Sequence, residues 1–472
     1  MTSLQFELES ASAVKTLGAG LSALQSQLRW LRPGIGVKRW LVLLLLGATL
    51  LGLGLLLFGT TLLGLGRVYL QVDMYRAEDA PSVAGTLTLQ FIPDVGRAAL
   101  LGLMGVVLVV IAVTRLSRTL LAPFIRPGQD LAGAVSEHRR QGRGPKVVAI
   151  GGGTGLSTLL RGLKRHTSNL TAIVTVADDG GSSGRLRRSL GVLPPGDFRN
   201  CIAALADDES LTTQLFQYRF GADKDLGGHS FGNLFITAMA EVAGSFERGL
   251  LESSRVLAIR GRVIPATLRN VTLVGELETA GGGAGARVSR VEGESQITLA
   301  EGAIRRVYLQ PEDVPAYPGA IRALLDADLI VLGPGSLYTS LLPNLLVRDL
   351  AEAIAASRAQ KVYVCNTATQ PGETEGYTVV DHVKAIERHT RPGLFPFVLA
   401  NSHRGGGLLP NLDWVHVDPL RANGALQLIT ADLIDAERPW RHDSGKLAEA
   451  LMNLIIAAQA GPAGLEEAPL GD

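Results

Sequence analysis

The chain has 472 residues, enough for two or three domains and a large core. Its 45 basic and 44 acidic residues nearly cancel, so no basic excess indicates nucleic acid, and we expect no nucleic-acid partner. The only two cysteines, Cys201 and Cys365, are far apart and lack C-x-x-C spacing, which argues against a disulfide framework and a thiolate zinc site.

Two apolar runs in the N-terminal region predict membrane spans at about residues 40–66 and 98–114. The first run has 27 residues without a charge, and roughly 20 apolar residues cross a bilayer. A cleaved signal peptide is disfavoured because this run is too long and starts too far into the chain. The second run has 17 residues between Arg97 and Arg115, so a buried or interfacial helix is its alternative. Residues 1–125 are therefore predicted to be a membrane anchor.

The basic residues around these runs predict the orientation of the anchor. They are concentrated before the first run and after the second, whereas the loop between the runs carries three basic and four acidic residues. The positive-inside rule then places both termini and the soluble domain in the cytoplasm, at the inner (plasma) membrane. Residues 126–145, rich in glycine, proline and arginine, are a predicted linker to a domain at 146–460. Residues 461–472 are expected to be a disordered tail.

A glycine-rich turn at the start of this domain is typical of a nucleotide-binding α/β unit. An apolar strand at 147–150 leads into Gly151, Gly152, Gly153, Thr154 and Gly155, and an amphipathic helical pattern follows. In such units, bare backbone approaches a phosphate at a helix N-terminus. The turn is neither a Walker A loop nor a regular G-x-G-x-x-G motif, and its glycines could serve only close helix–strand packing.

The next strand, 172–176, ends in two adjacent carboxylates, Asp178 and Asp179. Ligands of doubly wound sheets lie at the carboxyl ends of strands, and such a pair can bind ribose hydroxyls or a divalent cation. Backbone donors and basic side chains follow and suit a phosphate, namely those around Ser182, Ser183, Arg185, Arg187 and Arg188. A solvated acidic turn before a solvated basic helix face is the alternative.

Two further turns each open a predicted helix. Asp197 suits an N-cap, and Arg199 and Asn200 then lie in the first turn, where an arginine is unfavourable unless an anion is near. His229 and Asn233 are four residues apart, so both can face one pocket if their helix starts early, although His229 could be only a turn residue. No second histidine lies at metal-ligand spacing.

The spacing of apolar residues changes in residues 256–310. This pattern predicts a small antiparallel insertion, with strands at 263–270, 271–277, 296–299 and 305–309. A strand at 327–332 then enters a second glycine turn, with Gly333, Gly335, Ser336 and Tyr338 as candidate ligand residues. The strand at 361–365 ends at Asn366, and strands at 395–400 and 414–417 complete the sheet. The predicted fold is therefore α/β: a Rossmann-like, doubly wound, mostly parallel sheet with an antiparallel insertion, preceded by two transmembrane helices.

Several of these segments together resemble the YvcK family of gluconeogenesis factors, in the CofD-like superfamily. The resemblance spans roughly residues 145–458 and rests on 151–157, 173–185, 194–200, 228–233 and 333–344. It implies a Rossmann-like domain that binds a UDP-sugar, chiefly UDP-N-acetylglucosamine. It also implies a regulatory role linking carbon metabolism to cell-wall synthesis and cell shape. The membrane hairpin lies outside the resemblance, and shorter family members lack it.

The resemblance also implies which residues line the pocket. By similarity these are Gly152, Thr154, Gly155, Asp178, Asp179, Ser182, Arg185, Asn233 and Ser336. Arg441 matches a basic position in the family's C-terminal Arg-His motif and is expected to reach the pyrophosphate. Residues 402–412 depart from the family pattern, which puts contacts from that segment in doubt.

Two main hypotheses follow. A membrane-tethered UDP-sugar sensor needs no cofactor and signals through cell-envelope or central-metabolism proteins; it is favoured because no nucleophile or general-base constellation is evident. The alternative is a CofD-like phospho-carboxylate transferase in which Asp178 and Asp179 hold Mg²⁺. A scaffold with a vestigial pocket is a third, weaker reading. The identity of the sugar and self-association stay open.

Overall fold

The computed structural model describes residues 37–62, 93–121, 142–206, 211–221, 226–279, 287–418 and 426–459. The chain separates into two units, residues 1–137 and 138–472. Most of the predicted loop between the two apolar runs, most of the predicted linker and the predicted tail lie outside the described residues.

The N-terminal unit contains two long apolar helices, α2 (Lys38–Leu62) and α5 (Asp94–Leu121), which pack against each other. Glycines allow the close approach: a Cβ on Gly54 would lie 2.7 Å from the backbone nitrogen of Gly102. By length and composition, Lys38–Thr61 and Val95–Ser117 could each cross a membrane. The second helix is longer than the predicted span at 98–114 because polar residues extend it at both ends.

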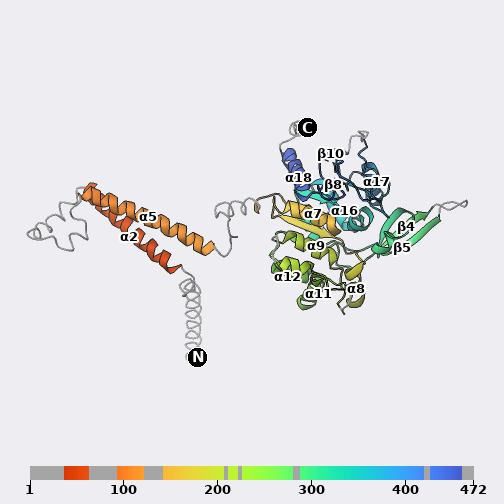
Figure 1. Ribbon diagram of the computed structural model, residues 1–472, viewed down its shortest axis with the longest axis horizontal. Helices are drawn as coiled ribbons and strands as arrows, with labels where there is room; N and C mark the ends of the chain where they lie inside the picture. The colour runs from red at the N-terminus through yellow and green to blue at the C-terminus, as the bar shows by residue number, and fades with distance from the viewer. Residues whose placement is uncertain are drawn as a thin grey trace, which may run out of the picture. The chain divides into compact units, whose positions relative to one another are not determined.

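The second unit is built on a seven-stranded, wholly parallel sheet in the order β10-β9-β8-β7-β1-β2-β3 (Figure 1). From β1 the chain moves outward through β2 and β3, then returns to the other side of β1 with β7. This is the Rossmann order, and the β1/β7 boundary is its topological switch point. The strands are β1 (Val147–Gly151), β2 (Leu170–Val174), β3 (Arg262–Pro265), β7 (Leu329–Leu332), β8 (Gln360–Val364), β9 (Phe397–Asn401) and β10 (Gln427–Ala431).

Helices connect and cover these strands. The strands β1, β2 and β7 are buried along their whole length, as expected for a parallel sheet covered on both faces. Helix α7 (Gly153–Leu163) packs against α9 (Gly196–Leu205) and α18 (Ser444–Gln459). The others are α8 (Gly181–Leu190), α10 (Leu211–Gln217), α11 (Phe231–Ala243), α12 (Phe246–Val256), α14 (Pro318–Leu325), η3 (Leu337–Leu341), α15 (Leu342–Leu345), α16 (Arg348–Ala356) and α17 (Val379–His389).

The antiparallel insertion exists, but its elements differ from the prediction. It consists of β4 (Thr272–Thr279), β5 (Arg287–Glu292) and β6 (Ala303–Gln310), in the order β5-β4-β6, and Figure 1 shows β4 and β5 projecting from the body of the unit. The strand predicted at 263–270 is instead β3 of the main sheet, paired in parallel with β2.

Three further strand predictions need correction. The strand predicted at 296–299 overlaps the short helix α13 (Glu294–Ile297). The prediction missed β5, which is exposed along almost its whole length and so has no apolar face to reveal it. Residues 414–417 form only isolated bridges, and β10 ends the main sheet instead.

Candidate functional site

The two glycine turns meet at the switch point. A Cβ on Gly155, in the first turn of α7, would lie 2.4 Å from the carbonyl oxygen of Pro334 and 3.0 Å from the backbone nitrogen of Gly335. The neighbouring atoms belong to the backbone and cannot swing aside, so only glycine permits this contact. The ends of β1 and β7 are thereby held together, where ligands of this fold bind.

A cavity of about 350 Å³ opens at this junction. Its size lies within the range of small-molecule sites. Eight of the predicted residues line it: Gly152, Gly153, Thr154, Gly155, Gly335, Ser336, Asn366 and Arg441. The remaining lining residues were not singled out from the sequence: Thr158, Pro334, Ser340, Thr367, Ala368, Thr369, Gln370, Leu412, Trp440 and His442. Thr367 to Gln370 could have been found, because they directly follow Asn366 at the end of a predicted strand.

The N-terminus of α7 lines this cavity, and its N-cap residue provides no side-chain cap. Its N-cap residue, Gly152, is extended and offers no side chain to the first-turn N–H groups. The first turn of a helix carries the positive end of its dipole, so it attracts an anion when no side chain occupies it. Thr367 also lines this cavity, and its buried hydroxyl has no hydrogen-bond partner among the described residues.

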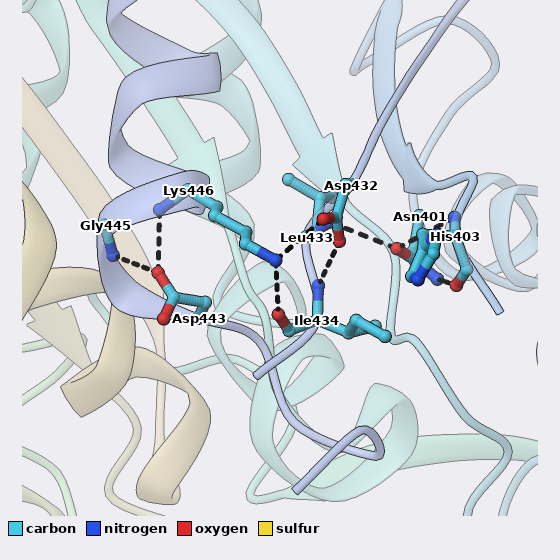
Figure 2. Close-up of polar contacts among 8 residues, drawn as sticks. All are labelled: Asn401, His403, Asp432, Leu433, Ile434, Asp443, Gly445 and Lys446. Atoms are coloured by element: carbon cyan, nitrogen blue, oxygen red, sulfur yellow. Dashed lines mark hydrogen bonds and ion pairs between the residues drawn. The ribbon is translucent and has the colours of Figure 1, made fainter. Parts of the chain in front are cut away.

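The loop that carries Arg441 is fixed by polar contacts at its two ends (Figure 2). Asp432 at its start accepts a hydrogen bond from Lys446 Nζ at 2.7 Å, and the backbone N–H of Leu433 donates to Asn401 Oδ1 at 3.1 Å. Asp443 at its end accepts from the backbone N–H groups of Gly445 and Lys446, both at 2.8 Å, and so caps α18. The exposed Arg441 is therefore presented to the cavity from an anchored loop.

The second glycine turn is occupied by the protein's own carboxylate. Glu373 is buried; it accepts a hydrogen bond from the backbone N–H of Tyr338 at 2.9 Å and from the Thr339 hydroxyl at 2.7 Å. Burial raises the pKa of Glu373, and these two donors oppose the rise. The Tyr338 side chain is fully buried and its hydroxyl meets that of Tyr377 at 2.9 Å. Tyr338 is therefore a core residue, contrary to its prediction as a ligand residue.

Asn366 holds the same turn from the other side. Its Nδ2 donates to the carbonyl of Gly335 at 2.9 Å, and its Oδ1 accepts from the Gly335 N–H at 3.3 Å. Gln370 Nε2 donates to the Ser336 hydroxyl at 2.7 Å. Gly335 and Ser336 therefore contribute a rigid wall of the cavity. Gly151 and Gly333 lie behind this wall: the Gly151 carbonyl accepts from Asn344, and the Gly333 N–H donates to the carbonyl of Ile150.

Three carboxyl groups gather beside the first glycine turn. Burial, and next the charge of Asp178, raise the pKa of Asp197 to about 7 and that of Glu294 to about 8. Burial also raises the pKa of Asp178, although the Gly180 N–H donates to it at 2.9 Å. Asp197 accepts from the Gly153 N–H rather than capping its own helix, which corrects its prediction as an N-cap. Its carboxylate also lies 2.6 Å from where a Cβ on Gly152 would be.

Asp179 supports the insertion rather than the cavity. Its Oδ1 accepts from the backbone N–H of Ser295 at 2.9 Å, in the first turn of α13, and its Oδ2 would collide with a Cβ on Gly293. Within the described ranges no three histidine, cysteine or acidic side chains are arranged to hold a metal ion. Asp179 therefore contacts the insertion, and the Mg²⁺ site at Asp178 and Asp179 under the transferase alternative stays a prediction.

Ser182 connects several predicted residues on the α8 side. Its hydroxyl oxygen accepts from Asn233 Nδ2 at 3.0 Å and lies 3.0 Å from His229 Nδ1. Arg185 Nε donates to His229 Nε2 at 3.3 Å, which leaves Nδ1 as the nitrogen that donates to Ser182. Helix α11 does start early, at Phe231, so His229 and Asn233 do meet at one point. The Asn233 Oδ1 is buried and has no partner in the part of the chain that is described.

The remaining predicted residues hold elements together. Ser183 Oγ accepts from the Gly196 N–H at 3.0 Å. Buried Arg199 donates to the Ser230 hydroxyl at 2.6 Å and to Asn200 Oδ1 at 2.8 Å, which gives it an internal role. Arg187 donates to the carbonyl of Val271, at the base of the insertion. The predicted site thus divides into two groups. The cavity group consists of the predicted residues that line the cavity, and the α8 group of those around Ser182, namely Arg185, His229 and Asn233. Asp197 lies next to the cavity group, at Gly152 and Gly153.

Fold and site together define a Rossmann-like α/β protein with a ligand cavity at its topological switch point. The sequence profile of the family described as 2-phospho-L-lactate transferase CofD matches residues 147–458. The Gluconeogenesis factor of Bacillus subtilis is 45% identical over 324 residues, covering 66% of this chain and 99% of the relative. A Deinococcus radiodurans relative is 39% identical over 435 residues, covering 90% of this chain and 89% of the relative.

A solved structure agrees with these sequence matches. The crystal structure of a UPF0052 family member from Bacillus halodurans is 45% identical and superposes with a TM-score of 0.60. It covers 66% of this chain and 99% of that protein, which therefore consists almost entirely of the α/β unit. The chain belongs to the gluconeogenesis factor family, with a CofD-like domain.

Proposed function

We propose that this protein is a membrane-tethered regulator that binds a UDP-sugar, with UDP-N-acetylglucosamine as the first candidate. The observation that carries the proposal is the N-terminus of α7, whose N-cap residue Gly152 has no side chain and which lines the cavity together with Arg441. Helix dipole and guanidinium both favour an anion such as a pyrophosphate. At the second glycine turn Glu373 accepts from both the Tyr338 N–H and the Thr339 hydroxyl, whereas at the first turn Asp197 accepts from one N–H, that of Gly153.

The rest of the cavity suits the neutral part of such a ligand. Its wall carries hydroxyl and amide groups from Thr367, Thr369, Gln370 and Ser336. The buried, unpartnered hydroxyl of Thr367 is the strongest of these features, because a buried polar group without a partner costs free energy until a ligand satisfies it. A sugar or ribose ring offers several hydroxyls to such a wall.

Membrane attachment through α2 and α5 is the second part of the proposal, supported by their length and apolar composition. In this reading both termini and the cavity are cytoplasmic, and the bound state is passed to cell-envelope or central-metabolism proteins. The protein would then adjust cell-wall synthesis and cell shape during gluconeogenic growth. A deletion strain complemented by wild type, but not by an Arg441→Ala variant, would show that ligand binding is required for this role.

Calorimetric titration of residues 138–472 with UDP-N-acetylglucosamine tests the ligand. This fragment is suitable because the Bacillus halodurans protein folds with almost nothing beyond this unit. Arg441→Ala should weaken binding about ten- to a hundredfold, as expected when one charged contact is lost. Arg438→Ala is the matched control, since Arg438 is exposed on the same loop but does not line the cavity. No binding at millimolar ligand would contradict the proposal.

The same titration locates the sugar end of the ligand. Thr367→Val removes the buried hydroxyl and should weaken binding if the ring lies against β8. Arg185→Ala should weaken it instead if the ligand passes the first glycine turn toward the α8 group. The two variants thus decide which of the two groups of predicted residues belongs to the binding site.

A CofD-like transferase is the second candidate, and the profile match to that family favours it. The carboxyl groups of Asp178, Asp197 and Glu294 beside Gly153 would be its acid or base. Incubation with nucleotide-linked phospho-carboxylate donors, acceptor alcohols and Mg²⁺ should then consume the nucleotide, and Asp197→Asn should stop the reaction. An unchanged nucleotide pool would leave the regulator as the better reading.

A further inference from the structure

The two ends of the parallel sheet carry opposite charge, although the chain as a whole has a net charge of only +1. The described loops before the strands contain seven basic and two acidic residues. These loops are residues 142–146, 164–169, 257–261, 326–328, 357–359 and 390–396. The described loops after the strands contain four basic and ten acidic residues. These loops are residues 152, 175–180, 266–271, 333–336, 365–378, 402–418 and 432–443. All strands are parallel, so each set of loops lies at one end of the sheet.

The basic end presents exposed basic residues before or at the start of several strands. We call it the amino-end surface and define it by its exposed basic residues: Arg143, Lys146, Arg165, Arg262, Arg358 and Arg391. Lys146 and Arg262 line a hollow of about 370 Å³ at the start of β1 and β3. In the described loops before the strands, the acidic residues are Asp326 and Asp328, and Asp326 forms an ion pair with Lys146 at 2.8 Å. This pair cancels the charge of Lys146, and because both partners are exposed it adds little to stability.

The chain arriving from the N-terminal unit joins the α/β unit at this same end. Asn169 Nδ2, just before β2, donates to the carbonyls of Gly142 at 3.1 Å and Gly144 at 2.8 Å. The Thr167 hydroxyl donates to the carbonyl of Pro145 at 2.9 Å. The twenty residues 122–141 connect this attachment to the end of α5, a candidate membrane span.

We propose that the amino-end surface docks on an anionic lipid bilayer, the membrane to which α2 and α5 tether the chain. The inference rests on the membrane part of the proposed function and is independent of the ligand. Basic residues near an anionic membrane each strengthen binding about fivefold, whereas the acidic opposite end is repelled. Docking therefore gives the unit one orientation, in which the cavity at the carboxyl end of the sheet opens away from the bilayer.

The helix termini offer a competing explanation for the same charges. Helices of this fold end near the amino ends of the strands, and basic residues there stabilise the helix dipoles. Arg165, Arg358 and Arg391 each follow a helix C-terminus. Charges that served only the helices would influence stability and leave lipid binding unchanged, so the two explanations predict different results.

Co-sedimentation of residues 138–472 with vesicles tests the proposal. We expect binding to mixed phosphatidylglycerol–phosphatidylcholine vesicles at low salt, weaker binding at high salt, and none to phosphatidylcholine alone. The triple variant Arg262→Gln, Arg358→Gln, Arg391→Gln should lose about a hundredfold in affinity, from about fivefold per charge. The control triple Arg248→Gln, Arg287→Gln, Arg438→Gln removes three exposed charges away from this end and should bind like wild type.

Three results would overturn the docking surface. They are no binding to anionic vesicles, an equal loss in both triple variants, or unchanged binding with only a lower melting temperature in the first triple. Titration of the same variants with UDP-N-acetylglucosamine separates this outcome from failure of the proposed ligand. Lipid binding without sugar binding keeps the surface and rejects the ligand, and the reverse result does the opposite.

Discussion

The two glycine turns at the switch point have similar sequence patterns but different hydrogen-bond partners. Each follows a buried strand and opens a helix, and they touch at Gly155 and Gly335. At the first turn the N-cap residue Gly152 offers no side chain and Asp197 accepts from the Gly153 N–H, whereas at the second turn Glu373 accepts from both the Tyr338 N–H and the Thr339 hydroxyl. The first turn has fewer of its donors occupied by the protein's own carboxylates, which favours it as the anion site.

The contrast assigns different parts of a ligand to the two turns. A phosphate fits at the first turn, since it finds the positive end of a helix dipole there. The second turn contributes shape, because Asn366 and Gln370 hold Gly335 and Ser336 in place. Three variants test this division through stability, which does not depend on knowing the ligand.

The largest effect on stability is expected from removing the Glu373 carboxylate from the second glycine turn. Glu373→Ala leaves the Tyr338 N–H and the Thr339 hydroxyl buried without their acceptor, and should lower the free energy of unfolding by about 3 kcal/mol or more. Glu373→Gln keeps one acceptor oxygen and should cost less. Denaturant unfolding of residues 138–472 measures both, with the exposed Glu301→Ala as control. Equal stability of Glu373→Ala and the control would refute the filled-turn interpretation.

A smaller effect on stability is expected from removing the Asn366 side chain, which holds Gly335 in place. Asn366→Ala removes two hydrogen bonds to the Gly335 backbone in a partly buried position, so about 1–2 kcal/mol of stability should be lost. Asn366→Asp keeps an acceptor for the Gly335 N–H but loses the donor to its carbonyl, and should lie between wild type and alanine. If Asn366 contacts ligand alone, neither variant will change the unfolding midpoint without ligand.

A third effect, measured as a change of stability with pH, concerns the carboxyl groups of Asp197 and Glu294. Because the folded-state pKa values of Asp197 (about 7) and Glu294 (about 8) lie above their ordinary values, their stabilising contribution is present at low pH. It is lost as the pH rises through those values. Asp197→Asn removes one ionisation, so the variant should gain stability relative to wild type between about pH 5 and pH 8.

Denaturant unfolding at several pH values measures this gain. Asp381→Asn is the control: backbone hydrogen bonding from Thr378 lowers the pKa of Asp381, so its loss should not vary across that range. Parallel pH curves for wild type and Asp197→Asn would show that Asp197 is not held in an unfavourable charged state beside Gly153.

Much of the site could be predicted from the sequence because strand ends and glycine turns are local features. Residues of the first turn, Asn366, Ser336 and Arg441 all line the cavity. The prediction was wrong where a distant partner decides the role. Tyr338 is buried by its neighbours, and Asp197 binds the N–H of Gly153 from another helix. Neither partner is visible from local spacing.

The sequence by itself determined the element types, the α/β class and the family, since apolar periodicity, glycine turns and long motifs are written along the chain. Only the tertiary structure decided which carboxylate reaches the donors of each glycine turn. Glu373 and the second turn are separated in sequence and meet because β8 lies beside β7. The tertiary structure also decided that the loops at the two ends of the sheet carry opposite charge. The charged residues are scattered over many loops in the sequence, and the parallel packing of the strands brings these loops together at the two ends.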